Sequence, residues 1–589
     1  MKNIFIKNYN NNLKALQEIG SKVIERISAF SMEEISLIKT YSDHYTYVYE
    51  IESRRIYINS KYNPIKEAQN SLKESRVKDY KNIFVMGLGL GYQLQEIINE
   101  ATKYNRIIVV EIDPLFIFIS LNLHDFSKKI KRGEVLFLSG KEKKWWTLPW
   151  WTLPIVDEKD IAIISHPVLY KNLQEDYDSI LQKLLNVRNR RVKIPSKKSI
   201  LLVNIFPYEA YEQLIMFLAE AFLGMGHKVK VVGREENAIR SEIINFIPDF
   251  IVSITFSVFL NKITQSLKIP YFCWEIDKVM NEEIYSEKYF SDYRYIYCVY
   301  LEDIEKFKKI GYKHVYYLPF VPNISLQNKI SSNDIIKYSH DICFVGSIMK
   351  YIGNSYFKFK NDLMDSIRDL PEEKKSTIKD TFFLIEEALQ QQERYSKENI
   401  YKLSELIMQL EDGTKINIAR MLGLSHKNLL NIIAKEACFR QRLDVINYLS
   451  DFKVAVYGNK DWEKMFMDNI DYHGKLEFCD EAPKVFNLAK INLNITRIYA
   501  LDGITDRVYN VLRSKGFLII NYAPVIERQF KIGEELICFK SHEELVDLCK
   551  YYLNHENERK AIAEKGYQRI LKDHTIEKRA EFMLEKLNE

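Results

Sequence analysis

Residues 492–522, NLNITRIYALDGITDRVYNVLRSKGFLIINY, contain the stretch that decides the fold. An apolar strand comes first, and a loop with the turn signal Asp502-Gly503 follows it. Thr505 can cap the next helix, in which apolar residues recur at helical spacing, and the buried strand 517–520 comes after a glycine. Open α/β sheets bind phosphorylated ligands at a loop and helix N-terminus of this kind, so the stretch predicts a phosphate-binding site.

Length and composition narrow the class of protein. A chain of 589 residues, 47% of them hydrophobic, predicts more than two folded domains at roughly 150 residues each. The net charge of +5 is small for this length and no long basic block occurs, which disfavours a nucleic-acid partner. The cysteines are scattered singly, and the sequence has neither a signal-peptide pattern nor an apolar run of membrane-helix length. We therefore expect a cytoplasmic protein with free thiols and no membrane span.

The first 190 residues predict a small α+β lead-in (1–75) and a Rossmann-like domain (76–190). In the second of these, a buried strand is followed by a glycine turn, a helix and another strand that ends in an acid. This order resembles the nucleotide site of class I methyltransferases, which implies S-adenosylmethionine as a ligand, although a tight strand-to-helix turn needs glycines even without a ligand. The residues of this second candidate nucleotide site are Gly87, Gly89, Gly91 and Glu111.

Two short motifs stand out in the same half of the chain. The segment YINSKY at residues 57–62, together with the glycine turn, resembles the opening of motility-accessory-factor (Maf-type) proteins, which modify flagellin with sugars. Residues 145–154 read WWTLP twice in succession. Their tryptophans could stack on a sugar or a partner, and the alternative is a duplication tolerated in a loop.

The rest of the chain predicts two more α/β domains, 199–325 and 326–589, because apolar strands alternate with amphipathic helices in both. A helical insertion at 356–448 interrupts the second of them after its first strand. The chain ends in predicted helices, and the last of these can cross back to the preceding domain. Two successive doubly wound domains with such a helix resemble the GT-B architecture of glycosyltransferases.

A series of motifs makes the resemblance more specific. In chain order they include FVGS (344–347), VYG (456–458), LNITR (493–497), RVYN (507–510) and GFLI (516–519). Together they resemble the CgeB-type (spore-maturation) glycosyltransferase family, with the likeness covering about 199–589. This resemblance implies a GT-B enzyme with a nucleotide sugar as its donor substrate.

The candidate site residues come from the helix start and from the resemblance. The departing diphosphate of a nucleotide sugar gathers negative charge, which Arg507 at the helix start can meet without a metal. Many retaining families carry two glutamates where this chain has Asp502 and Asn510, so the stereochemistry stays open. No Asp-x-Asp follows a strand, and we predict no bound divalent ion. The donor-binding candidates are Gly346, Ser347, Gly458, Arg497, Arg507 and Asn510, and the catalytic candidates are Glu275, Asp277 and Asp502.

The sequence thus predicts a metal-independent GT-B glycosyltransferase that needs no cofactor. Its acceptor would be a hydroxyl of a surface protein, such as flagellin or a spore-coat component, or of a glycan on that protein. Two alternatives remain open. The N-terminal domain could add an S-adenosylmethionine-dependent methyltransferase, or the chain could be a non-catalytic member that binds a glycan or a partner.

Overall fold

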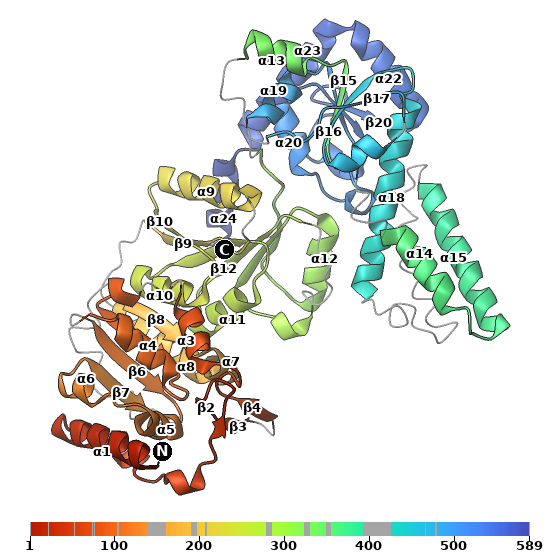
Figure 1. The fold of residues 1–589 in the computed structure, drawn as a ribbon. Helices are drawn as coiled ribbons and strands as arrows, with labels where there is room; N and C mark the ends of the chain where they lie inside the picture. Colours follow the sequence, from red (N-terminus) through yellow and green to blue (C-terminus); the bar gives the residue numbers. More distant parts are fainter. Residues whose placement is uncertain are drawn as a thin grey trace. The chain divides into compact units, whose positions relative to one another are not determined.

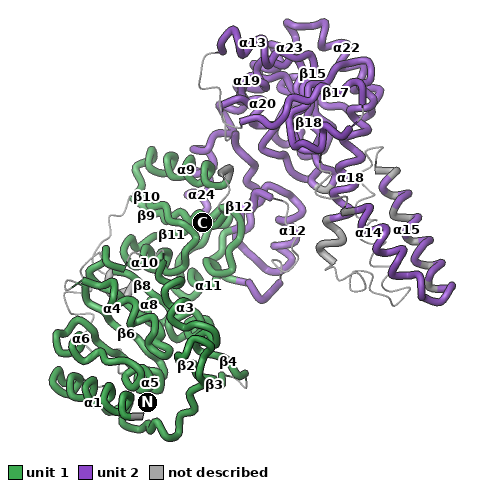
Figure 2. Tube along the Cα trace, viewed as in Figure 1, with its two compact units in different colours: residues 1–273, 291–295 green, residues 274–290, 296–589 purple. Residues whose placement is uncertain are grey.

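The computed structural model is an α/β structure with three parallel sheets (Figure 1). Contacts divide the chain into two compact units, residues 1–273 with 291–295 and residues 274–290 with 296–589 (Figure 2). The structure describes residues 2–587 except 22, 52–53, 74, 76, 103–104, 140–160, 190–196, 207–208, 278–285, 323–329, 349–354, 393–425, 466 and 478–479. The tryptophan repeat at 145–154 therefore lies outside the described residues.

The first sheet has four parallel strands in the order β7-β6-β5-β8. Every residue of β5 and β8 is buried, which explains why both strands are continuous apolar runs in the sequence. In the lead-in before this sheet, β3 and β4 pair antiparallel. The elements are α1 (Lys2–Glu18), α2 (Val23–Ile27), β1 (Ile38–Lys39), β2 (Tyr45–Thr46), β3 (Val48–Ile51), β4 (Arg54–Tyr57), α3 (Pro64–Leu72), β5 (Asn82–Met86), α4 (Tyr92–Glu100), β6 (Arg106–Glu111), α5 (Pro114–Leu123), α6 (Ser127–Lys131), β7 (Val135–Ser139), β8 (Ile161–Ser165), α7 (Pro167–Asn172) and α8 (Gln174–Asn189).

The second sheet has six strands in the order β10-β9-β11-β12-β13-β14. Strand β9 pairs in parallel with β10 and β11, as β13 does with β14. Helices separate most of these strands, as the sequence predicts; between β12 and β13 the described residues form only the 3-10 turn Glu287–Tyr289. The elements are β9 (Ser199–Val203), α9 (Glu209–Gly224), β10 (Lys228–Val232), α10 (Glu236–Phe246), β11 (Phe250–Ile254), α11 (Val258–Leu267), β12 (Tyr271–Glu275), β13 (Arg294–Cys298), α12 (Leu301–Ile310) and β14 (Val315–Tyr317).

The third sheet also has six parallel strands, in the order β17-β16-β15-β18-β19-β20. Three helices of the predicted insertion, α14, α15 and α18, lie between β15 and β16 in the chain. The elements are α13 (Ser332–Tyr338), β15 (Ile342–Val345), α14 (Ser355–Ser366), α15 (Glu372–Gln392), α18 (His426–Tyr448), β16 (Val454–Tyr457), β17 (Ile470–Tyr472), α19 (Glu481–Leu488), β18 (Ile491–Asn494), the 3-10 turn η9 (Ile498–Ala500), α20 (Asp506–Arg513), β19 (Leu518–Asn521), α21 (Pro524–Glu527), β20 (Ile537–Phe539), α22 (His542–Asn554), α23 (Glu556–Asp573) and α24 (Ile576–Leu587).

Apolar side chains bury both faces of the third sheet. Along β19, Ile519 belongs to the cluster on one face, and Leu518 and Ile520 belong to the cluster on the other. Side chains of a strand alternate between faces, so a run of consecutive apolar residues requires helices on both sides. The sheet orders confirm the predicted α/β class: two successive doubly wound domains of the kind found in GT-B folds, preceded by a further Rossmann-like domain.

The last helix, α24, packs against the end of the second sheet, as expected for a helix that crosses back. The buried Arg579 donates from Nε to the carbonyl of Pro319 at 2.8 Å and from Nη2 to that of Phe320 at 3.0 Å. The hydroxyl of Tyr297 on β13 donates to the carbonyl of Met583 at 3.5 Å. These bonds hold the last helix of the second unit against β13 and the segment that follows β14.

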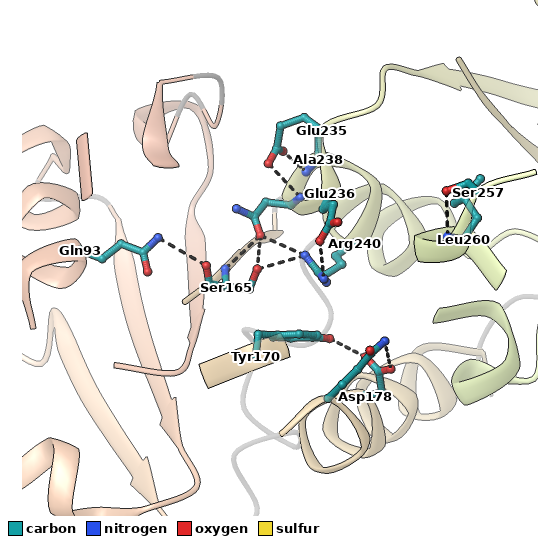
Figure 3. A network of polar contacts seen from close by, with 12 residues as sticks. Gln93, Ser165, Tyr170, Asp178, Glu235, Glu236, Ala238, Arg240, Ser257 and Leu260 are labelled. Carbon is teal, nitrogen blue, oxygen red and sulfur yellow. Dashed lines mark hydrogen bonds and ion pairs between the residues drawn. The ribbon is translucent and has the colours of Figure 1, made fainter. Parts of the chain in front are cut away.

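Helix α10 covers the open edge of the first sheet. Its three edge-binding residues are four positions apart and therefore share one face of the helix. Their side-chain oxygens accept main-chain N–H groups of the edge strand β8 at 2.7 to 3.1 Å. The pairs, helix residue first, are Asn237 with Ser165, Ser241 with Ile163 and Asn245 with Ile161. Arg240 adds a bond from Nη1 to Oγ of Ser165 at 3.0 Å (Figure 3). The helix protects an edge that could otherwise pair with another chain.

Candidate active site

The third sheet brings candidate residues to one edge, at its topological switch point. Strands β16 and β17 follow β15 on one side, and β18, β19 and β20 lie on the other. Doubly wound sheets bind ligands outside the carboxyl ends of the two strands at which the order reverses. In this sheet those strands are β15 and β18, which end at Val345 and Asn494. A ligand of this domain is therefore expected beside these two residues.

The turn after β15 packs tightly against the end of β16. The N–H of Gly346 donates to the carbonyl of Tyr457 at 2.7 Å, and the Gly346 carbonyl accepts from Nε1 of Trp462 at 2.8 Å. The Gly346 N–H is therefore used within the fold, and the assignment of Gly346 to donor binding stays a prediction. A Cβ on Gly458 would overlap the Gly346 carbonyl, so this close approach requires glycine at 458. A Cβ on Gly346 itself would lie 3.1 Å from Nη2 of Arg507, which places that guanidinium against the turn.

Arg507 lies in the first turn of α20, where the sequence predicts it. Its Nη1 donates to Oδ1 of Asn494 at 3.1 Å, and its guanidinium carbon lies 5.8 Å from the ring centroid of Phe344. Thr505 occupies the N-cap position as predicted, but its side chain makes no capping bond. The guanidinium is thus anchored by the ends of both strands at the switch point.

Charged side chains around Arg507 influence one another. Burial raises the pKa of the Asp506 carboxyl, and the positive charges of Arg507 and Arg497 oppose this increase. The negative charge of Asp277 raises the pKa of Asp506 further. Burial lowers the pKa of the Arg507 guanidinium, and the charge of Arg497 adds to that decrease. Arg497 and Asp277, both predicted site residues, therefore lie within electrostatic reach of the Asp506–Arg507 pair.

Arg442 is a member of this cluster that the sequence analysis missed. It lies on α18, is buried, and donates from Nη1 to the carbonyl of Ser347. Its guanidinium carbon lies 5.7 Å from the ring centroid of Phe344, the same ring that Arg507 faces. The helix of Arg442 has no motif, so the only signal in the sequence was an arginine within an amphipathic stretch. We refer to Arg442, Arg497 and Arg507 as the arginine cluster.

Asp502 has a structural task in this arrangement. Its Oδ2 accepts the N–H of Glu302 at 3.0 Å, and its main-chain carbonyl accepts the N–H of Leu301 at 3.2 Å. These N–H groups begin α12 and have no partner within their own helix. The next residue, Gly503, lies so close to the ring of Tyr300 that a Cβ would overlap it. Asp502 is a helix cap supplied by a distant part of the chain, which weakens its assignment as a catalytic residue.

Replacement of Asp502 distinguishes a cap from a catalytic carboxylate. Asp502→Asn keeps an oxygen that can accept the Glu302 N–H, so we expect near-normal stability and a turnover within a few-fold of the wild type. Asp502→Ala should destabilise α12 by about 1 kcal/mol, as other lost N-caps do. Hydrogen exchange at α12 and turnover of the donor measure the two effects. A loss of turnover of roughly 100-fold or more in Asp502→Asn would instead assign the carboxylate to the chemistry.

Two further predicted site residues, Glu275 and Asn510, are buried. Glu275 is buried at the carboxyl end of β12, and its carbonyl accepts the N–H of Val299 at 3.1 Å. The neighbouring Trp274 is fully buried and donates from Nε1 to the carbonyl of Leu318, so its ring belongs to the core. Asn510 is buried within α20, where its carbonyl accepts the hydroxyl of Ser514 at 2.8 Å. Its assignment to donor binding stays a prediction.

The glycine turn of the first sheet lies at the switch point of that sheet, between β5 and β8. The protein's own side chains occupy the crevice beside this turn. All five residues from 87 to 91 are buried. Gly89 has a φ of +55°, and a Cβ there would overlap the imidazole of His166, the residue after β8. The Asn59 amide bonds the N–H of Leu90 through Oδ1 at 3.2 Å and lies 3.3 Å from Nε2 of His166. The imidazole thus occupies the crevice in which related topologies bind nucleotides.

Glu111, the acid of the second candidate nucleotide site, uses its oxygens within the protein. Oε2 accepts the N–H of Leu88 at 2.6 Å, and Oε1 accepts the N–H of Asp113 at 3.0 Å and the hydroxyl of Tyr177 at 3.3 Å. The residue is fully buried, and this burial raises its pKa to about 7. Glu111 therefore fixes the glycine turn in place.

The described residues contain neither a metal-binding cluster nor a helix able to span a membrane. Among the residues that the structure describes, no group of three or more histidine, cysteine, aspartate or glutamate side chains is placed to hold a metal ion. In the same part of the chain, each helix is too short or too polar to cross a membrane.

Comparison with protein families finds two matching segments. Residues 438–585 match a family described as glycosyl transferase-like, and residues 42–135 match the glycosyltransferase Maf N-terminal domain. The first segment contains the whole arginine cluster, and the second contains the predicted Maf-like motif. The chain therefore carries a glycosyltransferase-like domain and a Maf-type N-terminal domain, and the narrower CgeB-type assignment stays a prediction.

Comparison with solved structures finds distant likenesses. They include the HepE protein of Anabaena in complex with UDP (10% identity, 66% of this chain and 99% of that one, TM-score 0.37). A glycosyltransferase of Rickettsia africae (9%, 66% and 97%, TM-score 0.40) and the T4 phage β-glucosyltransferase (10%, 66% and 99%, TM-score 0.36) are others. Comparison with curated proteins finds no match. These structures are too distant to support an argument about the reaction of this protein.

Proposed function

We propose that the protein is a glycosyltransferase and that the arginine cluster holds the diphosphate of its nucleotide-sugar donor. One observation carries this proposal: guanidinium groups from α18 and α20 converge on one aromatic ring at the switch point of a doubly wound sheet. That edge of a sheet is where such folds bind ligands. The segment that supplies the cluster also matches a glycosyl transferase-like family.

The chemistry of glycosyl transfer needs the charge that the cluster supplies. When the bond between the sugar and the diphosphate breaks, its electron pair goes to a phosphate oxygen, and the negative charge there increases. Fixed guanidinium groups bind phosphate oxygens with paired hydrogen bonds and stabilise this developing charge. Arg507 and Arg442 are already oriented by Asn494 and Ser347, so little reorganisation is needed when the donor arrives.

The acceptor hydroxyl must lose its proton as it attacks the sugar, and a carboxylate is a suitable base. Of the two predicted candidates, we favour Asp277, since it is exposed and acts electrostatically on Asp506 within the site. Glu275 is buried at the end of its strand. We propose a hydroxyl of a surface protein such as flagellin or a spore-coat component, or of its glycan, as the acceptor. The Maf-type N-terminal domain supports the choice of flagellin.

The donor can be identified with purified full-length protein. Thermal unfolding is measured with a panel of nucleoside diphosphates and the matching nucleotide sugars, and each sugar that protects is then tested for hydrolysis and transfer. We expect one nucleoside diphosphate to raise the melting temperature and its sugar derivative to be consumed. Protection without hydrolysis or transfer would favour a non-catalytic binding protein, and protection by no nucleotide would contradict the proposal.

The alternative of an added methyltransferase is tested in the same assay by S-adenosylmethionine. Its predicted site is the buried glycine turn, which His166 fills. Gly89→Ala is unsuitable as a control for this hypothesis, because the new Cβ would overlap the His166 ring and disturb the fold. Direct binding of S-adenosylmethionine to the wild type is the better measurement. An increase of the melting temperature by this compound would support the bifunctional hypothesis.

A further inference from the structure

A cavity of about 320 Å³ lies in the Maf-type N-terminal region, beside α4, and His166 is not among the residues that line it. Residues from α1, α3, α4, the end of α5 and the loop before β2 contribute to its wall. The volume is at the small end of the range for ligand pockets, so the occupant is small or is one end of a longer molecule. The cavity contains none of the candidate site residues and takes no part in the proposed transfer reaction.

Aromatic rings form a rigid part of the wall. The hydroxyl of Tyr92 bonds both the N–H and the carbonyl of Tyr45, at 2.9 and 3.0 Å, so the ring is held in one position. Its ring centroid lies 5.1 Å from that of His124 and 6.0 Å from that of His44, both in edge-to-face arrangements. Rings fixed in this way offer apolar contact to a ligand without loss of side-chain freedom on binding.

The polar groups in the wall are suited to hydroxyl groups. Nε2 of His124 lies 3.1 Å from the carbonyl of Leu90, and a carbonyl only accepts, so Nε2 carries the proton and Nδ1 keeps a lone pair. Burial lowers the pKa of His124 to about 4, so the ring is neutral near pH 7. Asp43 and Glu96 add carboxylate acceptors. Hydroxyl groups donate to acceptors of both kinds.

The charge of the wall argues against other ligands. It contains two carboxylates and neither lysine nor arginine, which disfavours a phosphate. Asp43 already forms an ion pair with Lys39 at 2.6 Å, and Glu96 accepts a hydrogen bond from Gln69 at 3.1 Å. These partners reduce the attraction of both carboxylates for a cation. A neutral molecule with several hydroxyl groups and an apolar face fits the remaining requirements.

A second aromatic feature begins two residues before Asp43. The rings of Tyr41 and Tyr62 stack with centroids 5.4 Å apart, although their residues are 84% and 71% exposed. The N–H of Tyr41 donates to the carbonyl of Lys61 at 2.9 Å, which holds the two segments together. Exposed aromatic rings of this kind commonly mark interaction sites. We call this pair the tyrosine platform.

We propose that the cavity binds the terminal sugar of a neutral glycan and that the tyrosine platform contacts the adjoining part of the same glycan. This site is separate from the arginine cluster, and binding there requires no transfer chemistry. The inference therefore goes beyond the proposed function and can fail or succeed independently of it.

Binding is tested with full-length protein and a panel of neutral monosaccharides and disaccharides (glucose, galactose, mannose and N-acetylglucosamine series), by saturation-transfer NMR and calorimetry. Glu96→Gln removes a charged acceptor and should weaken binding roughly tenfold or more. Ile65→Trp, which fills the cavity from α3, should abolish it. Glu100→Gln, one turn further along α4, is the matched control and should bind normally. Tyr41→Ala should weaken a disaccharide and leave a monosaccharide unaffected.

Unchanged melting temperatures and unchanged protection by nucleoside diphosphates show that these variants are folded and that the donor site is intact. The proposal is overturned if no neutral sugar in the panel binds the wild type, or if Ile65→Trp binds as well as the wild type. It is also overturned if tetramethylammonium, used as a cationic probe, displaces the sugar from the cavity. In none of these cases is the proposed transferase site affected.

Discussion

Arg507→Ala is expected to lower kcat/KM for the nucleotide-sugar donor by about 10² to 10³-fold, the usual effect of removing a fixed group that stabilises charge in a transition state. The physical reason is that Arg507 lies at the ends of both switch-point strands, where the departing diphosphate is proposed to bind. Steady-state kinetics with the donor identified in the nucleotide screen measure the effect. Arg442→Ala should give a loss of similar size, because its guanidinium faces the same ring.

The matched control is Arg513→Ala in the last turn of the same helix. Arg513 donates to the hydroxyl of Tyr567 at 3.2 Å, so its loss removes a charge and a hydrogen bond from α20 without touching the switch point. We expect kcat/KM within about threefold of the wild type. Arg442→Lys should restore only part of the activity, since an ammonium cannot reproduce paired guanidinium bonds. If Arg507→Ala retained activity at the level of Arg513→Ala, the diphosphate would have to bind elsewhere.

The second large effect is a loss of stability of the first sheet at acidic pH, caused by His166. His166→Asn should gain about 2.5 kcal/mol of local stability relative to the wild type when the pH falls from 7.5 to 4.5. Burial lowers the pKa of His166 to about 4, below the value near 6.5 of an unfolded histidine. The neutral ring therefore contributes stability that is complete above pH 6.5 and is lost as the pH falls through about 4. Its Nδ1 accepts the N–H of Leu169 at 3.3 Å, and protonation of that nitrogen removes the acceptor.

Asparagine at 166 can accept the same N–H, as a common N-cap residue, but does not titrate. Hydrogen exchange of the strands β5 and β8, compared between variant and wild type at each pH, measures the difference as a change in protection of roughly 100-fold. The comparison is needed because Glu111 acts in the opposite direction. Its raised pKa of about 7 means that its contribution is complete below pH 4.5 and is lost as the pH rises through 7. A pH-independent difference would show that His166 does not titrate in this range.

The sequence predicted the helices and strands more completely than it predicted the residues of the candidate site. The helix expected after the first glycine turn is found as Tyr92–Glu100, and the strand expected at 517–520 is found as Leu518–Asn521. Arg507 stands in the first turn of its helix because the capping position and apolar spacing are properties of neighbouring residues. Arg442 could not be found in this way, since it meets Ser347 across 95 positions of sequence. The same is true of Asp502, which caps a helix 200 positions away.

The sequence by itself determined the strands, the helices, their parallel winding and the arginine at the helix start, since these depend on local hydrogen bonding and on the spacing of apolar residues. Only the tertiary structure decided what each loop faces. It placed Arg442 beside Phe344, used Asp502 as a cap and put the His166 ring into the first glycine turn. Such contacts arise from the packing of side chains distant in the chain, and no local pattern encodes which residues meet.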